Sequence, residues 1–271
     1  MRLRSFLGLC MLLLLGSIPE GAWGQGQLTT AVAPARVEKI VNPGSKVTDV
    51  MTFTNQGDVP VTVTLSLVDF DMNEAGEVVE LPPGTASNTV APYFRISPLR
   101  TVVAPQERAN FRYSVQTPED FDQLRAFVYF ESEPQEAEET DGRRVVFATA
   151  MGIPFYVESR KAERGALTID NVTWERTGDE QEYLTLKLSA TNIGGRNVRP
   201  GGFLMVRSED DAFSQTFDVN PGGDVVLPGH TRDLSWRFGP VPAEALSLKL
   251  RFETSYRSNH ESDHHLPAAG E

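Results

Sequence analysis

Cysteine is almost absent from this sequence: Cys10 is the only one among 271 residues, and it lies in an apolar run near the N-terminus. If that run is removed on export, no thiol remains for a disulfide, a thiolate nucleophile or a cysteine-bound metal. An exported chain without disulfides must be stabilised by burial, and about 245 residues divided between two domains can bury enough.

Histidine is scarce too, and the four histidines all lie at or after His230. No histidine can therefore act as a general base in the first domain. The sequence also lacks a Gly-x-Ser-x-Gly turn, a phosphate-binding glycine loop and a His-Glu-x-x-His pair. These absences predict a protein that is not an enzyme and uses no cofactor.

Two groups of residues have side chains of the types that bind metals, but their sequence surroundings do not favour a metal site. His260, His264 and His265 are closely spaced imidazoles, but we expect them to lie in a disordered tail. Asp69 to Glu80 has several oxygen ligands at the spacing of a calcium-binding loop, yet Glu74 stands where that loop needs glycine. The sequence therefore predicts no metal site.

Basic residues are outnumbered, with 25 Lys and Arg against 37 Asp and Glu, a formal net charge of −12. Removal of residues 1–24, which contain Arg2, Arg4 and Glu20, makes it about −13. Binding to nucleic acid needs a basic face that releases counterions from phosphates. Nucleic acid is therefore excluded as the expected partner.

Long hydrophobic segments are also missing. The apolar run from Phe6 to Ile18 has about 13 residues, fewer than the roughly 20 that span a bilayer. It follows two arginines and precedes Ala22-Trp23-Gly24, as in a cleaved signal peptide. We expect cleavage after Gly24 and export to the periplasm as a protein that does not span the membrane.

Alternating β-branched, aromatic and polar residues dominate the rest of the chain, in runs separated by glycine and proline turns. Representative runs are 50–54, 61–68, 126–130 and 183–188. The turns recur about every 8 to 15 residues, which is typical of β-sandwiches. The expected fold class is all-β, with two immunoglobulin-like β-sandwich domains in tandem.

A repeated sequence motif divides the chain into two parts. Thr54-Asn55-Gln56-Gly57 ends one strand, and Thr191-Asn192-Ile193-Gly194 ends another in the same way. Two copies of one sandwich explain this, although similar turn chemistry alone remains an alternative. The expected division is a signal peptide at 1–24, a first sandwich at 25–158, a linker at 159–165, a second sandwich at 166–257 and a disordered tail at 258–271.

The first domain resembles the PapD-like periplasmic chaperones of pilus (fimbrial) assembly, and the second domain matches them only in size and β character. Five segments in order provide the resemblance: Pro34 to Val37, Phe94 to Pro98, Val103 to Pro105, Arg125 to Phe130 with Pro134 after it, and a last strand from Val145 to Tyr156. The resemblance implies two immunoglobulin-like domains set at an angle. It also implies an exported, pilin-like subunit as partner, together with an outer-membrane usher.

In that family the last strand of the first domain, after a flexible loop, adds to an incomplete subunit and offers alternating apolar side chains. The loop here is the acidic segment Glu131 to Thr140, which we expect to be mobile. Val146, Ala148 and Ala150 share one face of the strand, and its other residues share the opposite face. The sequence leaves open which face points outward. The expected binding residues of this strand are Val145, Val146, Phe147, Ala148, Thr149 and Ala150.

The family also holds the subunit's terminal carboxylate between an arginine of the first strand and a lysine of the last. Arg36 matches the first position and Lys39 competes with it, but no lysine stands near Gly152-Ile153. Two hypotheses follow. One is a periplasmic chaperone-like protein that shields exported subunits by strand addition, and the alternative is a non-catalytic envelope scaffold or adhesion module that keeps the fold without the cleft.

Overall fold

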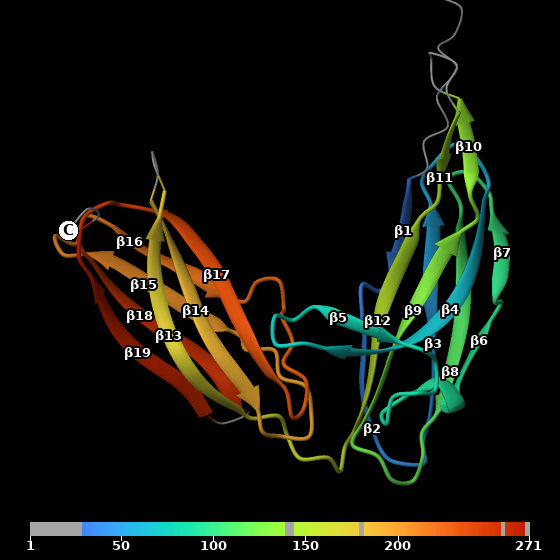
Figure 1. Ribbon diagram of the computed structural model, residues 1–271, viewed down its shortest axis with the longest axis horizontal. Helices are drawn as coiled ribbons and strands as arrows, with labels where there is room; N and C mark the ends of the chain where they lie inside the picture. Colours follow the sequence, from blue (N-terminus) through green and yellow to red (C-terminus); the bar gives the residue numbers. More distant parts are fainter. Residues whose placement is uncertain (1–28, 139–143, 179–181, 256–257, 269–271) are drawn as a thin grey trace, which may run out of the picture.

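The computed structural model describes residues 29–138, 144–178, 182–255 and 258–268, and nearly all of its regular structure is β-strand. Two sandwiches follow one another along the chain (Figure 1). The prediction of an all-β chain with two sandwiches in tandem is confirmed. The expected signal peptide lies outside the described residues. Within the described ranges, no helix is long and apolar enough to cross a membrane.

The first sandwich packs a four-stranded sheet against a six-stranded one. The first sheet has the order β1 (Thr30–Ala33), β3 (Lys46–Asn55), β8 (Arg108–Gln116) and β6 (Phe94–Ser97), the last preceded by the short 3-10 helix η1 (Ala91–Tyr93). The second has the order β2 (Val37–Val41), β12 (Ala150–Ser159), β9 (Gln123–Ser132), β4 (Val61–Met72) and β5 (Val78–Leu81), with β7 (Arg100–Val103) also paired to β4. The alternation predicted from sequence fills the core, because Val61, Val63 and Leu65 are buried while the threonines between them are not.

The second sandwich has sheets of three and four strands. They are β13 (Leu167–Thr177), β14 (Glu182–Asn192) and β17 (Thr231–Val241), and then β16 (Ser214–Val219), β15 (Gly202–Ser208), β18 (Leu246–Ser255) and β19 (Ser258–Leu266). Leu184, Leu186 and Leu188 of β14 face a core that includes Trp236. Their spacing of two residues is the one that places side chains on a single face of a strand.

The two copies of the repeated motif, at 54–57 and 191–194, have the same local structure. The Asn55 side chain donates to the carbonyls of Val59 at 2.7 Å and Val103 at 3.0 Å, and its oxygen accepts the Gly57 N–H. Asn192 donates to the carbonyls four residues ahead and of Val226, and accepts the Gly194 N–H. Each buried asparagine therefore supplies hydrogen bonds to a loop that has no sheet partner of its own.

The prediction of a disordered tail from Ser258 is wrong for Ser258–Leu266, which form β19 and pair with β18. The His260 ring stacks on Phe252 with centroids 5.0 Å apart, and the His264 ring lies 5.6 Å from Trp174. This segment is polar in composition, so it was expected to be disordered. It is an alternating strand, and the side chains on its inward face are imidazoles where most strands have aliphatic groups. Backbone pairing to β18 and these ring contacts hold it in place.

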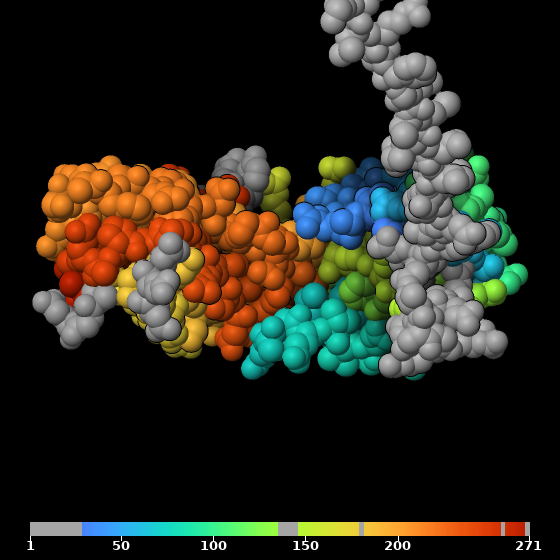
Figure 2. Space-filling view, turned by 90° about the horizontal axis from the view of Figure 1, so that it is seen from above, coloured from blue at the N-terminus to red at the C-terminus, as the bar shows by residue number. Residues whose placement is uncertain are grey.

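The two sandwiches meet through an apolar cluster and a hairpin. Phe70 and Tyr156 of the first sandwich pack with Val225 and Leu227 of the second. The β4–β5 hairpin extends from the first sandwich to the second (Figures 1 and 2), where the Asp233 N–H donates to the Glu74 carbonyl at 2.8 Å. This contact area positions both sites described next.

Candidate functional site

The N-terminal part of the first sandwich crosses from one sheet to the other and leaves part of β12 without a neighbour. β1 pairs with β3, whereas β2 pairs in parallel with β12, beginning at Val37 opposite Phe155. On the side of β12 where β2 lies, residues 150–154 have no strand partner among the described residues, although Thr30 of β1 contacts Met151 through its hydroxyl. Although β1 lies close to it, this stretch forms no ladder on that side among the described residues, so it is an edge at which a strand can pair.

The side chains of β12 show which of its faces is internal. Ile153, Phe155 and Val157 are fully buried in the core of the first sandwich. On the opposite face the Tyr129 ring covers Gly152, and a Cβ there would lie 2.8 Å from Tyr129 Cε1. The odd-numbered row is therefore internal in β12, and the even-numbered row faces away from that core.

The expected last strand, Val145 to Tyr156, is not continuous. β11 (Arg144–Phe147) pairs with β10 (Gln135–Glu138) in a hairpin, and the strand resumes as β12 at Ala150. At the break the Thr149 N–H donates to Ser132 Oγ at 2.8 Å, and the Ser132 N–H donates to the Thr149 carbonyl at 2.8 Å. This reciprocal pair fixes the base of the hairpin.

The hairpin also changes the expectation for the acidic loop Glu131 to Thr140. Residues 131 and 132 continue β9 and 135–138 form β10, so this part of the expected loop is strand, and 139–140 lie outside the described residues. Val146 and Phe147 of β11 are 59% and 45% exposed, although neighbouring side chains of a strand point to opposite faces. Neither side chain is buried, because the β10–β11 hairpin lies outside the sandwich. Of the other expected residues, Val145 is in β11 opposite Ala137, while Ala148 and Thr149 form the break.

The two candidate cations of the first domain lie in different surroundings. Lys39 shares a strand face with buried Val37 and pairs with Asp49 of β3 at 2.9 Å. The hydrogen bond from Lys39 is the main reason that the pKa of Asp49 is lowered. Arg36 precedes β2, and its Nε lies 3.5 Å from Glu38 Oε2. Lys39 therefore pairs across the two sheets of the first sandwich, whereas Arg36 lies close to Gly223 of the second sandwich.

Sequence reasoning missed a second cation beside Arg36. Arg199, from the segment between β14 and β15 of the second sandwich, donates from Nε to Glu38 Oε1 at 2.7 Å. Its guanidinium also lies 5.8 Å from the centroid of the Tyr156 ring and donates to the Gly223 carbonyl. Burial is the main reason that the pKa of Tyr156 is raised, and the nearby Arg199 opposes it. No signal in the sequence links Arg199 to Glu38, because 161 positions separate them.

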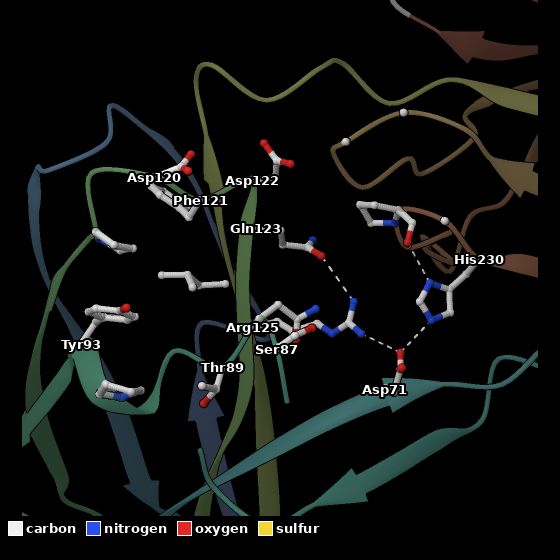
Figure 3. Close-up of a pocket in the computed structure, with 18 residues that line it drawn as sticks. Asp71, Ser87, Thr89, Tyr93, Asp120, Phe121, Asp122, Gln123, Arg125 and His230 are labelled. Carbon is white, nitrogen blue, oxygen red and sulfur yellow. Dashed lines mark hydrogen bonds and ion pairs between the residues drawn. The ribbon is translucent and has the colours of Figure 1, made fainter. Parts of the chain in front are cut away.

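A second polar cluster lies on a cavity of about 660 Å³ between the domains (Figure 3). At its centre is Arg125 of β9, whose side chain is only 5% exposed. Its Nε donates to the Phe70 carbonyl at 3.0 Å, and its Nη2 lies 2.6 Å from Asp71 Oδ1. Burial lowers the pKa of Arg125, and the Asp71 carboxylate opposes that effect. The His230 ring of the second sandwich reaches the same Asp71 oxygen, so this carboxylate joins the two domains.

Neither group of residues singled out as possible metal ligands is arranged for metal binding. Asp69 is buried and accepts the Thr85 N–H at 2.9 Å and the Thr89 hydroxyl at 2.7 Å. In β19 the His260 and His264 rings face inward, while His265 pairs with Glu209 at 3.4 Å. Within the part of the chain that the structure covers, no three His, Cys, Asp or Glu side chains form a metal-binding group.

No family model and no curated protein matches this chain. Many of the solved structures that match it are chaperones, several of them described with fimbriae, pilin or pili. A chaperone–tip adhesin complex of CFA/I fimbriae biogenesis matches with 10% identity and a TM-score of 0.45, covering 89% of this chain and 100% of that one. The Escherichia coli chaperone DraB matches with 15% identity and a TM-score of 0.41, covering 87% and 96%. The Pseudomonas aeruginosa CupB2 chaperone matches with 14% identity and a TM-score of 0.41, covering 89% and 100%.

Proposed function

We propose that this protein is a periplasmic chaperone-like factor that binds and shields exported subunits by β-strand addition at the β11–β12 edge. The observation that supports this best is the open edge of β12 at residues 150–154, where β2 has not yet begun to pair. A strand edge offers a row of N–H and C=O groups, and an incoming strand satisfies them while shielding its own.

The side chains along this edge suit an apolar partner. Val146 and Phe147 are exposed on β11, and Met151 is partly buried against the core of the first sandwich. Val146 and Phe147 are adjacent on this hairpin, so together they offer an incoming strand apolar surface on both faces of β11. The partner with the matching chemistry is an exported subunit whose sandwich lacks a strand, such as a pilin-like protein.

The boundary between the domains supplies the second part of the proposed site. Arg36 occupies the position that the family resemblance assigns to a carboxylate-binding arginine, and a C-terminal carboxylate gains charge-assisted hydrogen bonds from a guanidinium. The proposal requires no catalytic residue and no cofactor. It places the protein in the periplasm, after export through residues 1–24, and gives it an outer-membrane usher as a second partner.

The test compares two surface valines of similar exposure. Val146 lies on β11 and is 59% exposed, and Val102 lies on β7 and is 62% exposed. The mature protein, residues 25–271, would be mixed with a secreted subunit encoded beside its gene, and light scattering would report the aggregation of that subunit. We expect the native protein and Val102→Asp to suppress aggregation and form a complex, and Val146→Asp to do neither, because a carboxylate would enter the apolar contact.

Equal protection by the two variants would contradict strand addition at this edge. If the native protein itself neither protected the subunit nor formed a complex with it, the alternative function, an envelope scaffold or adhesion module, would be favoured.

A further inference from the structure

The carboxylate of Glu38 lies between two guanidinium groups that come from different domains. Arg199 Nε and Nη2 both lie 2.7 Å from Glu38 Oε1, and Arg36 Nε lies 3.5 Å from Oε2. The two Arg199 nitrogens contact one carboxylate oxygen and Arg36 lies near the other, and such charge-assisted pairing is stronger than a neutral hydrogen bond. Glu38 therefore occupies a site in which two guanidinium groups hold one carboxylate.

The surrounding residues hold Arg199 in place, and Arg36 lies close to the same loop of the second sandwich. The Arg199 side chain is only 21% exposed, and it is fixed by the Gly223 carbonyl and the Tyr156 ring. Gly223 has a φ of +71, and a Cβ on it would lie 3.1 Å from Arg36 Nη1. Both guanidinium groups therefore lie close to Gly223 of the second sandwich. A larger residue at that position would crowd them.

We propose that Glu38 is a built-in competitor for a carboxylate-binding site formed by Arg36 and Arg199. The ligand is the C-terminal carboxylate of the strand added at β12, so this inference rests on the proposed function. On binding, the incoming carboxylate replaces that of Glu38 on both arginines. Arg199, from the second domain, then supplies the cation that β12 lacks near Gly152-Ile153.

The charge and exposure of Glu38 make the exchange feasible. Its side chain is 40% exposed, so it returns to water without leaving a buried charge unpaired. The chain has a formal net charge of −12, which disfavours the approach of other anions to most of its surface. A self-occupied site therefore rejects weakly bound anions and admits a carboxylate that arrives on an already paired strand.

The experiment measures the binding of a fluorescent peptide of alternating valine and serine, ending either in a free carboxylate or in an amide. We expect Glu38→Gln to tighten binding of the carboxylate form about two- to fivefold and to leave the amide form unchanged. Glu107→Gln, at an exposed glutamate in the same domain, makes the same change in net charge and controls for long-range repulsion. Arg199→Lys keeps the charge but loses the fork, and should reduce the preference for the carboxylate.

An equal gain for both peptides, or no gain beyond that of Glu107→Gln, would overturn the inference while leaving strand addition intact. A second measurement separates the two proposals: the Nε–Hε NMR signals of Arg36 and Arg199 are followed as N-acetylvaline or its amide is added. This small probe needs no strand edge. Shifts with the carboxylate alone, larger in Glu38→Gln, would support the site even if no peptide bound and the proposed function failed. An absence of shifts in both proteins would overturn the site.

Discussion

His230 of the second sandwich and Asp71 of the first are joined by a contact of 2.7 Å between Nε2 and Oδ1. The other ring nitrogen, Nδ1, lies 2.9 Å from the Pro228 carbonyl, and Asp71 Oδ1 also accepts from Arg125. With the apolar cluster around Phe70 and the docked β4–β5 hairpin, this junction fixes how the sandwiches are set against each other. The relative position of Arg36 and Arg199 depends on that arrangement.

The first prediction concerns the junction itself. Asp71→Asn removes the charge that compensates the buried Arg125 guanidinium, and should lower the free energy of unfolding by about 1 to 3 kcal/mol. Urea unfolding measures this loss, and small-angle X-ray scattering should show a wider range of domain arrangements. Asp120→Asn, at an exposed carboxylate on the rim of the same cavity, should change neither quantity. Identical behaviour of the two variants would show that the junction does not hold the domains.

The second prediction follows from the burial of His260. Burial is the main cause that lowers its pKa from 6.5, with His264 adding to the effect. The unfolded chain therefore binds more protons than the folded one as the pH falls below about 6.5. Stability contributed by the neutral ring should be complete above that pH and lost below it.

The melting temperature measured from pH 8 to pH 5 tests this prediction. The His260→Leu variant should lose part of the decline at acid pH, whereas His265→Leu, at an outward-facing ring of the same strand, should retain it. A decline of equal size in His260→Leu and the native protein would contradict the assignment.

The third prediction concerns the glycine under Tyr129. Gly152→Ala places a Cβ 2.8 Å from the Tyr129 ring and 3.1 Å from Phe127, so the rings must move. We expect a loss of about 1 to 3 kcal/mol, the usual cost of overpacking. Gly201→Ala, where the added Cβ has no heavy atom within 4 Å, is the matched control and should be nearly neutral. Thermal unfolding compares them, and equal melting temperatures would show that the ring contact is not constraining.

The fourth prediction uses the repeated asparagine. Asn55→Ala and Asn192→Ala each remove a buried amide that makes four hydrogen bonds to backbone groups: three carbonyls and one N–H for Asn55, and two carbonyls and two N–H groups for Asn192. Each should destabilise its own sandwich by about 1 to 3 kcal/mol, because the loop groups are left without partners. Hydrogen exchange measured by domain should show faster opening of the first sandwich in one variant and of the second in the other. Equal effects on both sandwiches would contradict a local role.

Much of the fold follows from local patterns in the sequence. Alternation in 61–68 and 183–188 predicts strands because each second side chain must enter a core. The motif that contains Asn55 is repeated at Asn192, which predicts equivalent turns, and in the structure the two asparagines make equivalent hydrogen bonds. The pattern failed at β19, because its inward row contains His260 and His264 in place of aliphatic residues, and polar composition was interpreted as disorder.

Less of the candidate site could be predicted from the sequence. The resemblance pointed to Arg36 with Lys39 as a competitor, and the ion pair between Lys39 and Asp49, which joins two sheets, could not be predicted from the sequence. Arg199 could not be found from the sequence because its role depends on the packing of two domains. The break at Ala148 and Thr149 depends on the side chain of Ser132 in a different strand, so a strand pattern alone could not predict it.

Strand addition at β12 is tested most directly by amide hydrogen exchange of the mature protein, alone and in complex with its secreted subunit. The account predicts strong new protection of the backbone amides of β11 and of residues 150–153, and little change in β7, whose valine serves as the control above. Protection that appears elsewhere, with β11 and the start of β12 exchanging as fast as in the free protein, would contradict it.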